Sequence, residues 1–155
     1  MAAVAALAVP ALVLGSPGTA SAQVASKTVA AEVACNGFTN VSVGGSRYLH
    51  VPSTRGGSGN YNCVVARGMN GFHVLVVQES LNACYGQNID EDRDFGSGTE
   101  RAVKNAQTQI NRSAGSHVLD VDGRFGPKTS SKFRYQAYDY SNGQNGRHTG
   151  VCYTR

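Results

Sequence analysis

Acidic residues recur at short intervals in two parts of this chain, and carboxylates spaced in this way can bind calcium. Asp90, Asp92 and Asp94 match the first three acidic positions of a calcium loop. The sixth position of such a loop needs glycine and the twelfth needs a bidentate glutamate, but this chain has Phe95 and Arg101 there. The residue types therefore argue against calcium, and we expect no metal site.

The acidic residues belong to an internal repeat. Segments 89–99 and 119–129 both consist of an apolar residue, Asp-x-Asp, and then Phe-Gly-x-x-Thr. Such repetition is typical of a doubled supersecondary unit. We expect each copy to be a loop that leads into a helix, with Phe95 or Phe125 in the core and the threonine satisfying N–H groups of the first turn. The aspartates would hydrogen-bond loop amides or lie near helix N-termini.

The remaining reactive side chains form no catalytic pattern. The histidines are His50, His73, His117 and His148. Their spacing contains no His-x-x-x-His or His-Glu-x-x-His motif, and the chain has no Gly-x-Ser-x-Gly elbow. Glycoside hydrolysis needs two carboxylates across a cleft, and nothing around Glu79 or Glu100 in the sequence would raise a pKa. We therefore expect a protein that is not an enzyme and has no cofactor.

The N-terminal segment indicates export. An apolar run over 2–14 is followed by Ala20-Ser21-Ala22, the small-x-small pattern that signal peptidase cleaves, so residues 1–22 are predicted to be a signal peptide. The run is too short to span a bilayer, which takes roughly 20 apolar residues. Because no Lys or Arg precedes it, either the true start lies upstream of Met1, which we favour, or the signal is weak.

Four cysteines in an exported chain predict two disulfides. Of the three possible connectivities, we prefer Cys35–Cys63, which flanks a segment with strand character, and Cys84–Cys152, which ties the tail to the first helix. Each would stabilise the fold by about 3–4 kcal/mol. A zinc site is the alternative, but the chain has no Cys-x-x-Cys pair and the compartment is oxidising.

Hydrophobic patterning places a hairpin ahead of three helices. Alternation over 41–43 and 48–51 predicts a β-hairpin, and 61–65 is a candidate third strand. Apolar residues at helical spacing predict a helix between Asn70, as its cap, and Gly86, and a second over about 97–111. A third helix should begin at Pro127, with Phe133, Ala137 and Tyr140 facing inward. We expect a mainly α fold: a three-helix bundle with the two repeated loops and a small N-terminal β-hairpin region.

The helical region resembles a known family. The motifs are Val77-Gln78-x-x-Leu81-Asn82, Tyr85-Gly86, the two repeated loops, and Ala102-Val103 between them. Together they resemble a peptidoglycan-binding domain of the small three-helix type, over 70–138. Arg93, Ser97 and Ala106 depart from the family's usual Gly, Pro and large aromatic residue. The resemblance implies a domain over 70–140, an N-terminal extension with a hairpin and a disulfide over 23–69, and a disulfide-tied tail over 141–155.

The resemblance implies that the protein is a secreted, non-catalytic module that binds the glycan or stem peptide of cell-wall peptidoglycan. We expect a monomer, located outside the cell or at the wall, with no nucleic-acid partner and no membrane span. Its candidate contacts are Tyr85, Gln87, Arg93, Asp122, Arg124 and Tyr135, because Arg can pair with stem-peptide carboxylates and Tyr can stack on sugars. The net charge of +4 suits an anionic polymer. The alternative is a protein-interaction or inhibitor role for the disulfide-tied hairpin and its Gly-rich loop.

Overall fold

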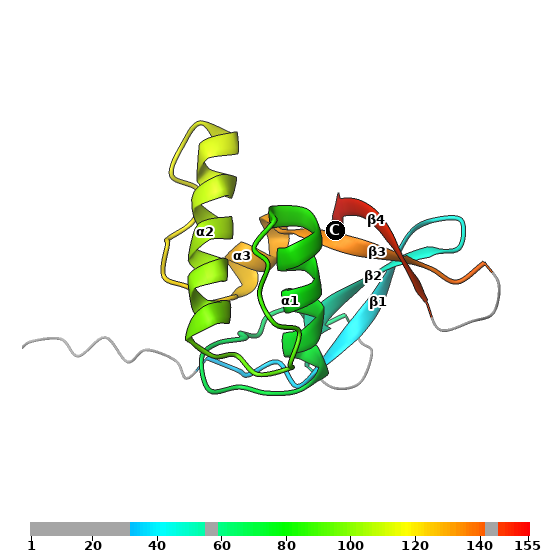
Figure 1. The fold of residues 1–155 in the computed structure, drawn as a ribbon, viewed down its shortest axis with the longest axis horizontal. Helices are drawn as coiled ribbons and strands as arrows, with labels where there is room; N and C mark the ends of the chain where they lie inside the picture. Colours follow the sequence, from blue (N-terminus) through cyan, green and yellow to red (C-terminus); the bar gives the residue numbers. More distant parts are fainter. Residues whose placement is uncertain (1–31, 55–58, 142–145) are drawn as a thin grey trace, which may run out of the picture. The chain divides into compact units, whose positions relative to one another are not determined.

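The computed structural model describes residues 32–54, 59–141 and 146–155, which all belong to one unit spanning 31–155. The elements run β1 (Gly37–Gly44), β2 (Arg47–Ser53), α1 (Phe72–Tyr85), α2 (Ser97–Ala114), α3 (Pro127–Lys132), β3 (Arg134–Asp139) and β4 (Arg147–Thr154) (Figure 1). The predicted signal peptide, 1–22, lies outside the described residues, as do 23–31 and the 55–58 part of the Gly-rich loop.

The predicted mainly α fold is wrong, because the strands form a four-stranded antiparallel sheet in the order β1-β2-β3-β4. The N-terminal hairpin is confirmed as β1 and β2, which pair from Gly37 opposite Ser53 onward. The other two strands come from segments expected to be the third helix and an irregular tail. β3 pairs with β2 on one side and with β4 on the other. The fold is therefore mixed α/β, with two strands before the helices in the sequence and two strands after them.

The sequence conceals β3 because this strand is buried on both faces. All residues from Tyr135 to Tyr138 are buried, so the strand lacks the alternation of a half-exposed strand. Phe133 and Ala137 also lie one helical turn apart, which suits a helix equally well. In the structure α3 ends at Lys132, and Phe133 has extended backbone with φ −77° and ψ 142°. Pairing with β2, which is distant in sequence, and with the next strand, β4, decides the conformation.

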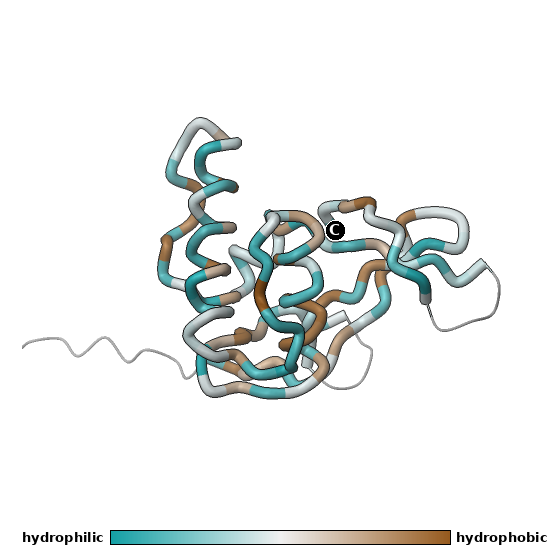
Figure 2. The backbone as a smooth tube through the Cα atoms, viewed as in Figure 1, coloured by the Kyte–Doolittle hydropathy of each residue, from teal (hydrophilic) through white to brown (hydrophobic). Residues whose placement is uncertain are grey.

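The hydrophobic core lies between α1, the sheet and the repeated loops. Its largest fully buried side chains include Tyr135, Phe95, Phe125, Phe133, Leu49 and Leu81. The helix α2 is mostly hydrophilic along its length (Figure 2). Ala102, Val103 and Ala106 are its apolar residues in this core, so α2 contacts the core along one face.

Both phenylalanines of the repeat are buried, as predicted: Phe95 is 0% exposed and Phe125 is 1% exposed. Each is also paired through its backbone with one short segment, 65–69. Phe125 exchanges hydrogen bonds with Val65 (3.0 and 2.9 Å). The N–H of Phe95 donates to the Met69 carbonyl (2.8 Å), and its carbonyl accepts from Gly68 (3.0 Å). The segment 65–69 therefore holds both corners of the repeat at once.

The structure contains both expected disulfides. Cys35 and Cys63 are joined with Cα atoms 5.0 Å apart, which links the start of the hairpin to the chain that follows it. Cys84 in α1 is joined to Cys152 in β4, with Cα atoms 5.9 Å apart. The second disulfide crosses from the helices to the sheet and so fixes the edge strand β4 against the end of α1.

Two local predictions need correction. Residues 61–65 do not form a strand of the sheet; Val64 and Val65 make isolated bridges instead. Asn70 does not cap α1, because the N-cap is Gly71 and no side chain caps it. Asn70 is instead bridged to Asp94 in the first repeated loop. The left-handed end of α1 at Gly86 is confirmed, with φ 62° and ψ 39°.

Replacing Phe125 by alanine should lower the free energy of unfolding by about 3–5 kcal/mol, since it removes a buried ring and leaves a cavity. Phe72→Ala provides a matched control because Phe72 is 54% exposed, and it should cost less than about 1 kcal/mol. Chemical denaturation followed by circular dichroism measures both. Equal losses in the two variants would contradict the packing role of Phe125.

Candidate functional site

A buried glutamine in α1 holds the first repeated loop. Gln78 is 1% exposed and donates through Nε2 to Asp92 Oδ1 (2.8 Å), the Asp94 carbonyl (3.0 Å) and Thr99 Oγ1 (3.1 Å). Its Oε1 accepts from the Arg93 N–H (2.9 Å). One side chain thus connects a loop carboxylate, the loop backbone and the first turn of α2.

A second glutamine repeats this arrangement one helix later. Gln107 in α2 donates to Asp122 Oδ1 (2.8 Å), the Arg124 carbonyl (3.1 Å) and Thr129 Oγ1 (3.2 Å). Its Oε1 accepts from the Gly123 N–H (2.9 Å). The partners occupy corresponding positions of the two loops, so the two copies of the repeat share the same hydrogen bonds as well as the same sequence pattern. We call each set a glutamine clamp.

An asparagine one turn after each glutamine anchors the head of the loop. Asn82 donates to the Ile89 carbonyl (2.8 Å) and accepts from the Ile89 N–H (2.9 Å). Asn111 does the same with Leu119, at 2.7 and 2.8 Å. The motif Gln-x-x-x-Asn therefore precedes both loops, and this repeated spacing is the sequence signal that could have identified the clamp residues.

Two of the aspartates, Asp92 and Asp122, accept hydrogen bonds from loop amides, as predicted. The Asp92 carboxylate accepts from the Asp94 N–H (2.9 Å), and that of Asp122 accepts from the Arg124 N–H (2.9 Å). The Asp94 N–H and then the Gln78 amide lower the pKa of Asp92. No group of three or more His, Cys, Asp or Glu residues that could hold a metal occurs within the described residues.

The threonines play a different part from the one predicted. The N-caps of α2 and α3 are Gly96 and Gly126, and neither has a side-chain cap hydrogen bond. Thr99 Oγ1 instead accepts from the clamp glutamine and lies 3.3 Å from the Asp94 carbonyl, to which it donates. Each threonine therefore completes a clamp and does not cap its helix.

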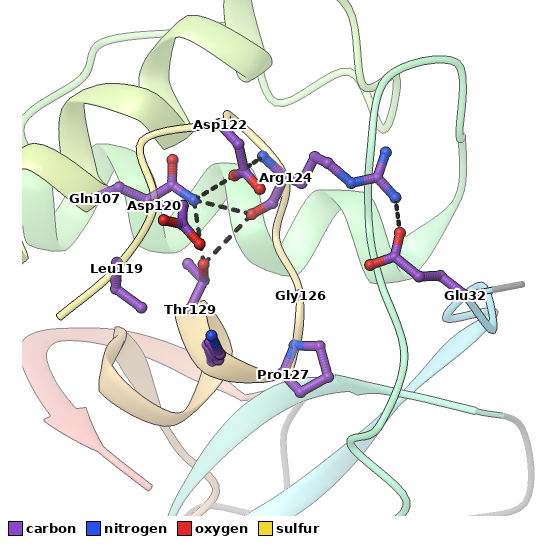
Figure 3. Close-up of a pocket in the computed structure, with 10 residues that line it drawn as sticks. Glu32, Gln107, Leu119, Asp120, Asp122, Arg124, Gly126, Pro127 and Thr129 are labelled. Carbon is purple, nitrogen blue, oxygen red and sulfur yellow. Dashed lines mark hydrogen bonds and ion pairs between the residues drawn. The ribbon is translucent and has the colours of Figure 1, made fainter. Parts of the chain in front are cut away.

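The second loop borders a hollow of about 420 Å³ (Figure 3). Asp120, Asp122, Arg124 and Lys128 are among its lining residues, and the Gln107 clamp lies in its wall. Glu32, from the segment before β1, forms an ion pair with Arg124 at this hollow. Charges of both signs thus face the space, together with the apolar surface of Leu119 and Pro127.

Some of the predicted contacts meet here, and others lie elsewhere. Asp122 and Arg124 both line the first hollow. Tyr85 is 7% exposed and lines a second hollow, of about 450 Å³, which has different lining residues. Gln87 donates to the Tyr85 carbonyl (2.7 Å) and accepts from Asn105 (2.9 Å).

The last two candidate contacts, Arg93 and Tyr135, lie elsewhere in the structure. Arg93 has φ 68°, and its guanidinium carbon lies 4.2 Å from the centre of the Phe72 ring. Tyr135 is 0% exposed, and its hydroxyl is hydrogen-bonded to Ser130 Oγ (2.7 Å). Its ring is therefore part of the core, and we leave Tyr135 out of any ligand surface. The candidate contacts do not converge on one site.

Residues 71–133 match the family model described as "Putative peptidoglycan binding domain". This segment is therefore similar to a domain of that family. The family domain contains α1, α2, α3 and both clamps, whereas all strands of the described chain lie outside it. The family match and the two disulfides suggest a cell-wall or extracellular location.

The comparison with solved structures returned a peptidoglycan-binding protein from Clostridioides difficile, crystallised with glutamine hydroxamate. The likeness has 26% identity and a TM-score of 0.38, and covers 59% of this chain. It covers 53% of the other protein, so this chain aligns with about half its length. No curated protein matches the chain. No helix among the described residues is long and apolar enough to cross a membrane.

A separate group of titratable side chains lies on the sheet. The His50 ring is stacked on Tyr138 (centroids 3.9 Å apart) and lies 4.6 Å from Phe38. Its Nε2 is 2.8 Å from the Tyr140 hydroxyl. Burial, and then the neighbouring His148, lower the pKa of His50 to about 4. The neutral imidazole is therefore the form that this site accommodates.

The same group extends to α1 through Glu79. The Tyr138 hydroxyl donates to its carboxylate, and His148 Nε2 lies 3.9 Å from Glu79 Oε1. Burial raises the pKa of Glu79 and that of Tyr138. These contacts join α1 to β3 and β4 across a partly buried polar interface.

Replacing Gln107 by leucine should lower the free energy of unfolding by about 2–4 kcal/mol, because it leaves the buried clamp partners without hydrogen bonds. Amide exchange at Gly123 should also accelerate, since Gln107 Oε1 accepts that N–H. Gln109→Leu is the control, because Gln109 makes one long hydrogen bond (3.3 Å). Unchanged exchange at Gly123 in the Gln107 variant would contradict the clamp.

The contribution of His50 to stability should fall as the pH decreases from about 6.5 to about 4, which are its pKa values in the unfolded and folded states. In this window the unfolded chain binds a proton that the folded chain does not, so the loss is of order 1–3 kcal/mol after allowance for solvent screening. Denaturation curves across this range test it. His50→Phe should flatten the pH dependence, and an equally steep decline in that variant would assign it to other groups.

Proposed function

We propose that this protein is a secreted, non-catalytic module that attaches to peptidoglycan through residues 71–133. The observation that supports this most directly is the family match over that segment. The disulfides support export, because structural disulfides form and persist in oxidising compartments. The predicted signal peptide over 1–22 is consistent with the same route.

The first hollow is the surface we assign to this contact. Peptidoglycan offers hydroxyl and amide groups along its glycan and stem peptides, and carboxylates on the peptides. Arg124 and Lys128 can pair with the carboxylates, and Asp120 can accept hydrogen bonds from hydroxyl or amide donors. Asp122 is already committed to the Gln107 clamp, so it orients the loop and contributes little to ligand contact.

Glu32 adds a feature that the family domain lacks. It comes from the N-terminal extension and pairs with Arg124, with 53% of the Glu32 side chain and 46% of the Arg124 side chain exposed. An exposed ion pair of this kind is worth about 0–1 kcal/mol. A ligand carboxylate can therefore replace Glu32 at the guanidinium at low energetic cost, so the pair is compatible with binding.

The purified protein should sediment with insoluble peptidoglycan, and Arg124→Ala should weaken this binding about three- to tenfold, through loss of a charge-assisted hydrogen bond. Arg101→Ala, which removes the same charge from an exposed position in α2, is the control and should bind like the wild type. Sedimentation at several protein concentrations gives the apparent affinities.

Failure of the wild type to sediment would overturn the proposed function. If it instead retained a specific protein partner, the protein-interaction or inhibitor role of the hairpin would be favoured. Clearing of wall substrate in a zymogram would contradict the non-catalytic part of the proposal.

A further inference from the structure

The second hollow lies at the boundary between the family domain and the sheet. Its volume is about 450 Å³, and Ile110 of α2, Lys132 of α3, Arg134 of β3 and Thr154 of β4 are among its lining residues. Pockets that bind small molecules fall in the range of about 300–1,000 Å³. The hollow is therefore large enough for a ligand the size of a short peptide.

The charges that face this hollow have one sign. Lys132 and Arg134 are its charged lining residues, and none of the lining residues, all within the described chain, is acidic. The first hollow differs, because Glu32, Asp120 and Asp122 face it as well as basic residues. The second hollow thus presents an uncompensated positive charge to an anion that enters it.

Arg134 is held in position before any ligand binds. Its Nη2 donates to the Cys84 carbonyl (2.8 Å), and its backbone N–H donates to the Tyr85 hydroxyl (2.8 Å). A guanidinium has five N–H donors in a fixed planar arrangement, so the contact with Cys84 leaves others for a carboxylate. Because the Arg134 side chain is already oriented, binding an anion there costs less conformational entropy than binding to a freely rotating arginine would.

The rest of the wall suits small apolar groups. Ile110 and Val118 are partly buried and line the hollow together with Ala114 and Tyr85. The Tyr85 hydroxyl accepts from Arg134, so its own proton can be donated to a ligand oxygen. Cationic donors therefore lie beside methyl-sized apolar surfaces within one space.

We propose that this hollow binds the free carboxylate end of a short peptide whose side chains are small and apolar. The carboxylate would pair with Arg134 and Lys132, and the side chains would contact Ile110 and Val118. The site differs from the first hollow and would give the protein a second point of attachment. The assignment of its natural ligand to a stem-peptide terminus rests on the proposed function, because the wall polymer would supply such ends.

The test uses the full exported chain and N-acetyl-alanyl-alanine, in both the L,L and D,D forms, titrated by NMR. The free acid should shift the amide signals of Val118 and Arg134. The C-terminal amide of the same dipeptide, which lacks the charge, should bind at least about tenfold more weakly.

Lys132→Gln should weaken binding of the acid and leave binding of the amide unchanged. Arg101→Gln removes the same charge from an exposed position in α2 that lines neither hollow and serves as the matched control, with wild-type affinity expected. Arg134→Gln should cause the larger loss, and its amide spectrum reports whether the fold persists without the Cys84 contact.

Equal binding of acid and amide, or shifts confined to the first hollow, would overturn this inference. Sedimentation with peptidoglycan separates it from the proposed function. A wild type that sediments but binds no dipeptide in a carboxylate-dependent manner retains the proposed function and loses this site. A wild type that binds the acid selectively but does not sediment retains the site and loses the wall assignment.

Discussion

Each repeated loop is held by the amide of one buried glutamine, and this constraint determines the shape of the helical region. Gln78 and Gln107 use both ends of the amide: the two Nε2 hydrogens are shared among three oxygens, and Oε1 accepts from one N–H. A buried polar group left without partners costs about 1–3 kcal/mol, so the loop must keep the conformation that satisfies the amide. That conformation brings Phe95 and Phe125 into the core and sets where the next helix begins. The carboxylates of Asp92 and Asp122 therefore serve loop geometry.

The strands and the 65–69 segment lie outside the family domain, and they stabilise the helical region. The segment pairs with both Phe corners, and the Cys84–Cys152 disulfide fixes β4 to α1. α3 buries Thr129 and Ser130 in its middle and leads directly into β3, where Tyr135 and Ala137 are fully buried. A short helix is marginal by itself, so the burial of β3 stabilises α3 as well. The sheet is thus part of the same core as the helices.

The two hollows differ because different elements build them. The repeat builds the first, and its aspartates place acidic groups beside Arg124 and Lys128. The C-terminal part of α2, the ends of α1 and α3, and the sheet build the second, where only basic charges face the space. Under the proposed function, the two surfaces would contact different groups of the wall polymer. Weak contacts at two linked points can bind such a polymer more tightly than either alone.

The sequence by itself determined the features that depend on local pattern or on residue count. The repeat, the hairpin, the first two helices, the disulfide pairs and the burial of Phe95 and Phe125 could all be predicted, since each has a signal within a few neighbouring residues or in the cysteines. The resemblance led to the family domain, but the family domain contains no strand, so it could not reveal β3 or β4.

Tertiary structure decided the rest. β3 is buried on both faces and is held between β4 and the distant strand β2, so Phe133 and Ala137 at helical spacing were misleading. The candidate contacts were chosen for residue type near the loops, yet Tyr135 lies in the core, Tyr85 lines one hollow, and Arg124 lines another. Whether a polar or aromatic side chain faces solvent depends on which distant segment covers it, and that information is absent from any local stretch of the chain.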